Sequence, residues 1–118
     1  MGFLSDRIAA ERAGEAYVKR LQFPGVEPDT ARKTAKAIRW AVYSGFLDGL
    51  KDARDHGPQA DAHKACAVGF GSRFVAGLRG DWDKVTAEQA TQMKERFAGF
   101  FLVGFLQGAA KADHEAKP

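Results

Sequence analysis

Apolar residues recur at steps of three and four along most of the chain, and no run alternates apolar and polar residues as a half-buried strand does. This period predicts four helices, over residues 4–22, 29–55, 59–79 and 86–112, and an all-α four-helix bundle. Each helix has a stripe expected to face the core. The stripes are Leu4, Ile8, Ala13, Tyr17 and Leu21; Ala31, Ala35, Ile38, Val42, Phe46 and Leu50; Cys66, Phe70, Phe74 and Leu78; and Met93, Phe97, Phe101 and Phe105.

Proline and glycine separate these segments at 23–28, 56–58 and 79–83. Asp29 is expected to cap the second helix, because its carboxylate can accept backbone N–H bonds. Thr86 and Gln89 have the spacing of a capping box for the fourth helix. The last residues, 115–118, are expected to fray.

A length of 118 residues indicates a single domain, 1–118. Shifting the chain by 59 residues aligns Gly45-Phe46-Leu47-x-Gly49 with Gly104-Phe105-Leu106-x-Gly108, and seven of 28 aligned positions are identical. The chain is therefore either a duplication of two helical hairpins, 1–57 and 58–118, or a bundle with a chance likeness between two of its helices.

Gly45 and Gly49 lie on one face of their predicted helix, as do Gly104 and Gly108. A glycine inside a helix costs about 1 kcal/mol relative to alanine, so these pairs need a compensating role. Two interpretations stay open. The glycines allow another backbone to approach, within the fold or in a dimer, or they leave space for a ligand between the glycine faces.

A basic strip on the second predicted helix contains Arg32, Lys33, Lys36 and Arg39, with Trp40 beside it. It is either a solvated face or a contact surface for acidic protein, nucleic acid or anionic lipid. Trp82, between two aspartates in a predicted loop, either plugs the end of the bundle or anchors a partner. No helix-turn-helix spacing supports nucleic acid as the partner.

Three histidines, His56, His63 and His114, are expected near one end of the bundle, but their spacing matches no standard metal motif. We therefore predict no metal and no cofactor. No nucleophile motif surrounds the serines or Cys66, so an enzyme is not expected. The apolar run 97–110 is shorter than a membrane span.

The net charge of +3 is slight and does not by itself indicate a nucleic-acid partner. The lack of a signal-peptide pattern at residues 1–10 favours a cytoplasmic protein. The sequence favours a non-enzymatic interaction module: an inhibitor, adaptor or assembly factor, of the kind that phages or mobile elements encode. Its partner would be a protein with an acidic surface, and a homodimer is expected through the helix over 86–112 or the glycine faces. The alternatives are a small nucleic-acid-binding protein that uses the basic strip, and a bundle that binds a metal or small ligand.

Overall fold

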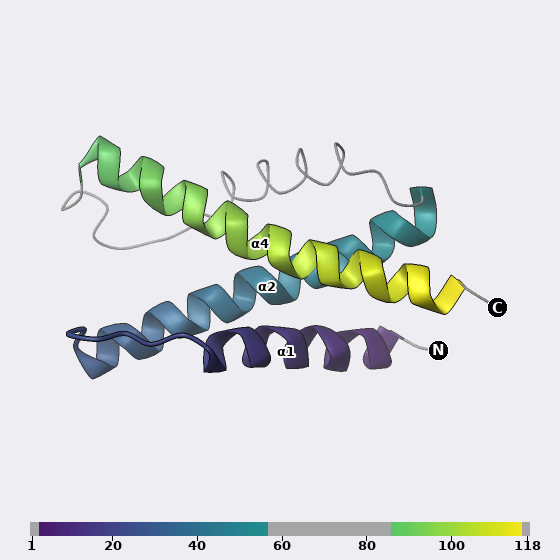
Figure 1. Cartoon of the computed structure of the whole chain (residues 1–118), viewed down its shortest axis with the longest axis horizontal. Coiled ribbons are helices and arrows are strands. Elements are labelled where there is room, and N and C mark those ends of the chain that lie inside the picture. Colours follow the sequence, from purple (N-terminus) through teal and green to yellow (C-terminus); the bar gives the residue numbers. More distant parts are fainter. Residues whose placement is uncertain (1–2, 57–85, 117–118) are drawn as a thin grey trace.

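The computed structural model describes residues 3–56 and 86–116, which form three helices and one connecting loop. The helices are α1 (Phe3–Lys19), α2 (Pro28–His56) and α4 (Ala87–Ala116) (Figure 1). Residues 3–56 and 86–116 contain no strand, which confirms the all-α class. The helix predicted over 59–79 lies outside the described residues. Within the described ranges, no helix has the length and hydropathy that crossing a membrane requires.

The helices α1 and α2 form an antiparallel hairpin, visible in purple and blue in Figure 1. Helix α1 ends at Lys19, earlier than expected, and the N–H groups of Arg20 and Leu21 bond back to Tyr17 and Val18. The loop then turns through Gly25, whose φ of 73° lies in the left-handed region that favours glycine.

The start of α2 differs from the sequence prediction. The N–H of Ala31 donates to the Glu27 carbonyl at 2.9 Å, so Glu27 rather than Asp29 occupies the capping position. Pro28 is the first helical residue, where its missing N–H and restricted φ are suited to the helix. Asp29 therefore lies inside the first turn, and the prediction that it caps the helix was wrong.

The start of α4 confirms the predicted capping box. The backbone N–H of Gln89 donates to the Thr86 hydroxyl oxygen at 3.1 Å, and the backbone N–H of Thr86 donates to Gln89 Oε1 at 2.9 Å. Two backbone donors of the first turn are satisfied in this reciprocal way.

The helices α2 and α4 run parallel to each other and cross in backbone contact at four glycines. A Cβ built on Gly45 would lie 2.1 Å from the Phe101 carbonyl oxygen, and one on Gly104 would lie 2.0 Å from that of Val42. Gly49 and Gly108 have the same relation to Phe105 and Phe46, at 2.0 and 2.1 Å. The glycine faces thus leave no space for a ligand between them, and that interpretation was wrong. They are packed against backbone within one chain, so they present no open glycine face to a second copy.

These contacts repeat with the offset seen in the sequence. Gly104 follows Gly45 by 59 residues, and the carbonyls that they approach, those of Phe101 and Val42, differ by the same number. The offset also relates two buried side chains near the crossing, Ile38 on α2 and Phe97 on α4. The two helices therefore exchange equivalent contacts across a local pseudo-twofold axis.

The core follows the predicted stripes of α2 and α4 but not that of α1. Among the residues that the structure describes, Phe101, Phe105, Leu50 and Val42 are the largest fully buried side chains. On α1, however, Leu4 and Ile8 are 69% and 41% exposed, whereas Ala10 is fully buried. Helix α1 instead packs small residues against α2. Gly14 lies so close to α2 that a Cβ there would be 2.9 Å from the Arg39 carbonyl oxygen. The predicted core positions Leu4 and Ile8 were therefore wrong.

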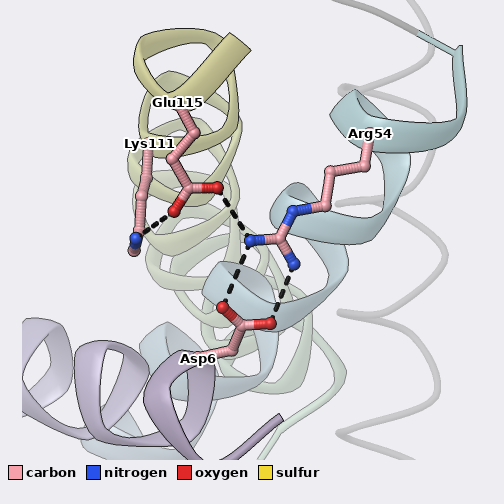
Figure 2. A network of polar contacts seen from close by, with 4 residues as sticks. All are labelled: Asp6, Arg54, Lys111 and Glu115. Atoms are coloured by element: carbon pink, nitrogen blue, oxygen red, sulfur yellow. Dashed lines mark hydrogen bonds and ion pairs between the residues drawn. The ribbon is translucent and has the colours of Figure 1, made fainter. Parts of the chain in front are cut away.

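An ion-pair network joins all three helices at one end of the structure (Figure 2). Arg54 of α2 donates two hydrogen bonds to Asp6 of α1, at 2.8 and 3.2 Å, and one to Glu115 of α4 at 2.9 Å. Lys111 donates to the other oxygen of Glu115. Helix α4 continues through Glu115 to Ala116, so the expectation that the tail frays from residue 115 was wrong.

The network also changes the acidity of its members. Hydrogen bonds from Arg54 lower the pKa of Asp6, and those from Lys111 and Arg54 lower the pKa of Glu115. The two carboxylates in turn raise the pKa of Arg54. Each effect favours the charged form that the folded state uses.

Candidate partner-binding surface

The basic strip of α2 divides into two parts in the structure. Arg32 and Lys33 bind the Asp29 carboxylate, with N–O distances of 2.5 and 3.2 Å, and these hydrogen bonds lower the pKa of Asp29. All three side chains are exposed at their charged ends, so the pairs add little stability. The Asp29 carboxylate does offset part of the positive charge of Arg32 and Lys33 at the N-terminal end of the strip.

The other part of the strip lines a groove between α1 and α2. This α1–α2 groove has a volume of about 450 Å³. Seven residues of the two helices line it: Arg7, Glu11, Glu15, Lys36, Arg39, Trp40 and Tyr43. The residues from α1 recur every four positions, as expected for one stripe of a helix. The structure thus brings Lys36, Arg39 and Trp40 together and leaves Arg32 and Lys33 outside the groove lining.

Two aromatic side chains stack in the groove. The ring centroids of Trp40 and Tyr43 are 5.8 Å apart, with planes inclined by 23°. Arg7 Nε donates a 3.1 Å hydrogen bond to the Tyr43 hydroxyl oxygen, which ties α1 to this stack. Trp40 is nevertheless 52% exposed. The indole is therefore held in position from one side and open to solvent on another.

Close packing of α1 fixes the groove beside the stack. The Cα of Gly14 approaches so closely that a Cβ there would lie 2.9 Å from both the carbonyl oxygen and Cγ of Arg39. The stem of Arg39 thus packs on α1, although the residue as a whole is exposed. An alkyl stem on an apolar surface with the charge in water is common for arginine.

The charge of the groove is mixed. Arg7, Lys36 and Arg39 contribute cations, and Glu11 and Glu15 contribute carboxylates. Neither Lys36 nor Arg39 forms an ion pair with any of the residues that the structure describes. The α1 side of this groove was not predicted from the sequence. The recurrence of Arg7, Glu11 and Glu15 at a spacing of four was the available signal.

The remaining candidate site residues do not join this groove. Gly45, Gly49, Gly104 and Gly108 lie inside the α2–α4 crossing. Trp82 and His63 lie outside the described residues. His56 is the last residue of α2, and His114 is exposed near the end of α4. Among residues 3–56 and 86–116, no three His, Cys, Asp or Glu side chains come close enough together to hold a metal ion.

Comparisons with known proteins give no relative to which this surface can be matched. No family model matches the chain, and neither a curated protein nor a solved structure is significantly similar to it.

Proposed function

We propose that this chain is a non-enzymatic protein-binding module that contacts its partner through the α1–α2 groove. The observation that carries the proposal is Trp40, which is 52% exposed yet held by its stack on Tyr43. Tryptophan, tyrosine and arginine are the residue types that most often dominate the energy of protein interfaces. An indole that is already positioned loses little conformational entropy when a partner covers it.

The charges beside the indole indicate the chemistry of the partner. Lys36 and Arg39 have no intramolecular ion pair in the described part of the chain, so a partner carboxylate would meet cations that are free to bind it. Glu11 and Glu15 occupy the opposite side and would repel a uniformly acidic surface. We therefore expect an apolar or aromatic partner residue beside one or two carboxylates. The same two glutamates disfavour a nucleic-acid backbone in the groove.

The test is quantitative capture of binding partners by the tagged 118-residue chain from its native host, with and without nuclease. Trp40→Ala and Lys36→Glu should each reduce recovery of a stoichiometric protein partner by about tenfold or more. Arg39 is left unchanged because its stem packs on Gly14.

Two variants serve as matched controls. Val26→Ala truncates an exposed apolar side chain, 42% exposed and outside the groove lining, and Lys94→Glu reverses an exposed charge on α4. Both should retain the partner, and circular dichroism should show that all four variants fold. Equal recovery with Trp40→Ala and wild type would refute the groove as the contact surface. Recovery that disappears with nuclease would favour the nucleic-acid alternative.

Self-association through the outer surface of α4 stays a prediction. The glycine faces, the other dimer contact expected from the sequence, are already packed within the chain. The exposed Leu106 gives α4 an apolar position for such a contact. Light scattering that shows a monomer at high micromolar concentration would exclude it.

A four-helix bundle of two related hairpins also stays our proposal for the whole chain. Its support is the 59-residue offset that both the sequence and the α2–α4 contacts display. Backbone chemical shifts measured over 59–79 would test it directly. Non-helical shifts there would contradict it.

A further inference from the structure

A hollow distinct from the α1–α2 groove lies between α2 and α4, on the N-terminal side of their crossing. The two helices touch at the glycines and diverge toward their N-termini (Figure 1). The loop after α1 covers part of the space between them with Leu21 and Phe23. A hollow of about 480 Å³ is left, which we call the α2–α4 hollow.

Its lining is mostly apolar. The six large apolar side chains on it are Leu21, Phe23, Ile38, Met93, Phe97 and Phe100. Ile38 and Phe97 are buried, whereas Leu21, Phe23 and Phe100 are only partly buried around them. Ala37 also lines the hollow, and its methyl group is too short to fill it. Apolar surface therefore stays accessible to solvent in a concave site of the size that small ligands occupy.

The charged residues among those described at the wall of the hollow are cations. Lys33 and Arg96 line it, and no carboxylate does so among the described residues that form its wall. Lys33 shares Asp29 with Arg32. Arg96 is exposed and forms no ion pair with the rest of the described chain. A guanidinium without a partner beside an apolar wall is suited to a ligand with an alkyl chain and a single carboxylate.

We propose that the α2–α4 hollow binds a free medium-chain aliphatic carboxylate, with the chain against Phe97 and Phe100 and the carboxylate on Arg96. The hydrophobic effect supplies most of the affinity, since each buried methylene tightens binding by about fourfold. The arginine adds selectivity for the anion over a neutral molecule of the same length. This site shares no residue with the α1–α2 groove and does not depend on the proposed function.

The test is a titration of the 118-residue chain with hexanoate, octanoate, decanoate and decanol. The acids are kept below their micelle concentrations and decanol below its solubility limit, and binding is followed by ¹H–¹⁵N spectra and calorimetry. Affinity should rise along the acid series, and the amides of Ala37, Arg96 and Phe97 should shift. Decanol should bind more weakly than decanoate. No detectable decanoate binding, or equal binding of decanol, would refute the proposal.

Variants separate this site from general adsorption. Arg96→Gln should weaken decanoate by about fivefold and leave decanol unchanged, whereas Arg12→Gln on the exposed side of α1 should change neither. Ala37→Leu fills the hollow and should weaken both ligands by about tenfold or more, with Ala110→Leu at an exposed position as its control. Trp40→Ala should bind decanoate like wild type. Unchanged decanoate affinity in both Arg96→Gln and Ala37→Leu would overturn the assignment.

Discussion

Replacing Gly104 by alanine tests whether backbone contact between α2 and α4 determines the fold. The new methyl group would lie 2.0 Å from the Val42 carbonyl oxygen and 3.0 Å from the Phe46 nitrogen. An ordinary contact begins near 3.4 Å, so the helices must separate by more than 1 Å at the crossing. The obstructing atoms belong to the backbone of a helix, so no side-chain rotation can relieve the overlap.

The magnitude follows from two opposing terms. Alanine is favoured over glycine inside a helix by about 1 kcal/mol. Overpacking of a well-filled core costs about 3 kcal/mol at the upper end of its usual range, which is appropriate where only backbone can yield. Separation of the helices also loosens Phe101 and Phe105, which are buried against the crossing. The free energy of unfolding should therefore fall by about 2 kcal/mol, which lowers Tm by roughly 8 °C in a domain of this size.

Gly99 provides a matched control on the same helix. It is exposed, and a Cβ built there meets nothing within 4 Å. Gly99→Ala therefore gains the helix propensity without the overlap, and the free energy of unfolding should rise by about 1 kcal/mol. The same chemical change thus has opposite signs at two positions five residues apart.

Urea unfolding followed by circular dichroism at 222 nm measures both variants, with thermal unfolding as a second assay. Gly45→Ala, the equivalent of Gly104→Ala on α2, should be destabilised by a similar amount. If Gly104→Ala were as stable as wild type or more so, the backbone contact would not limit the packing, and the reasoning would be refuted. A loss of stability in Gly99→Ala would show that the control position is not open.

Three further predictions concern local features. Arg54→Gln removes the partner of Asp6 and Glu115 and should lower the free energy of unfolding by about 1 kcal/mol at pH 7. Because the folded state lowers both carboxyl pKa values below 3.8 and 4.5, the contribution is complete above these values and is lost as pH falls below them. The gap between this variant and wild type in acid unfolding should therefore begin to shrink as pH falls below about 4.5, and a gap that stayed constant from pH 7 to pH 2 would contradict an electrostatic origin. Thr86→Ala should cost about 1 kcal/mol in urea unfolding and Thr86→Ser much less, since only the hydroxyl caps α4; equal losses would argue against the cap. Gly25→Ala should cost about 1 kcal/mol, because φ is 73° and no side chain is near to compensate; a Tm unchanged from wild type would show that the turn can rearrange.

Local features were predicted well where short-range physics decides them. The capping box of Thr86 and Gln89 formed because both groups lie within one turn of the same helix. The prediction that Asp29 caps α2 failed for an equally local reason. Proline is favoured at the first position inside a helix, so α2 begins at Pro28 and Asp29 lies within its first turn.

The candidate surface was predicted in part. The strip of cations and Trp40 is visible in one helical stripe of the sequence. Arg32 and Lys33 bind Asp29 three and four residues away on the same helix, so these pairs follow from local spacing. That Lys36 and Arg39 line a groove depends on where α1 lies. The contribution of Glu11 and Glu15 was missed because no local pattern in α2 reports the charges of a neighbouring helix.

The tail shows the same dependence on distant residues. Residues near a chain end are expected to fray when nothing holds them. Glu115 is held because Arg54 reaches it from α2, 61 residues earlier in the chain. Periodicity within α4 contains no information about that contact.

The sequence alone determined the helical class, the stripes of α2 and α4, and the glycine spacing that allows a close crossing. These depend on a period and on backbone sterics that act within a few residues. Tertiary structure decided which face of α1 is buried, which cations remain free and where two hollows open. A small residue such as Gly14 or Gly104 permits close approach, but the partner backbone and the direction of crossing depend on the summed packing of all the helices. These packing contacts join residues that are distant in the chain, so no local pattern in the sequence reports them. For this physical reason the candidate sites appear only in three dimensions.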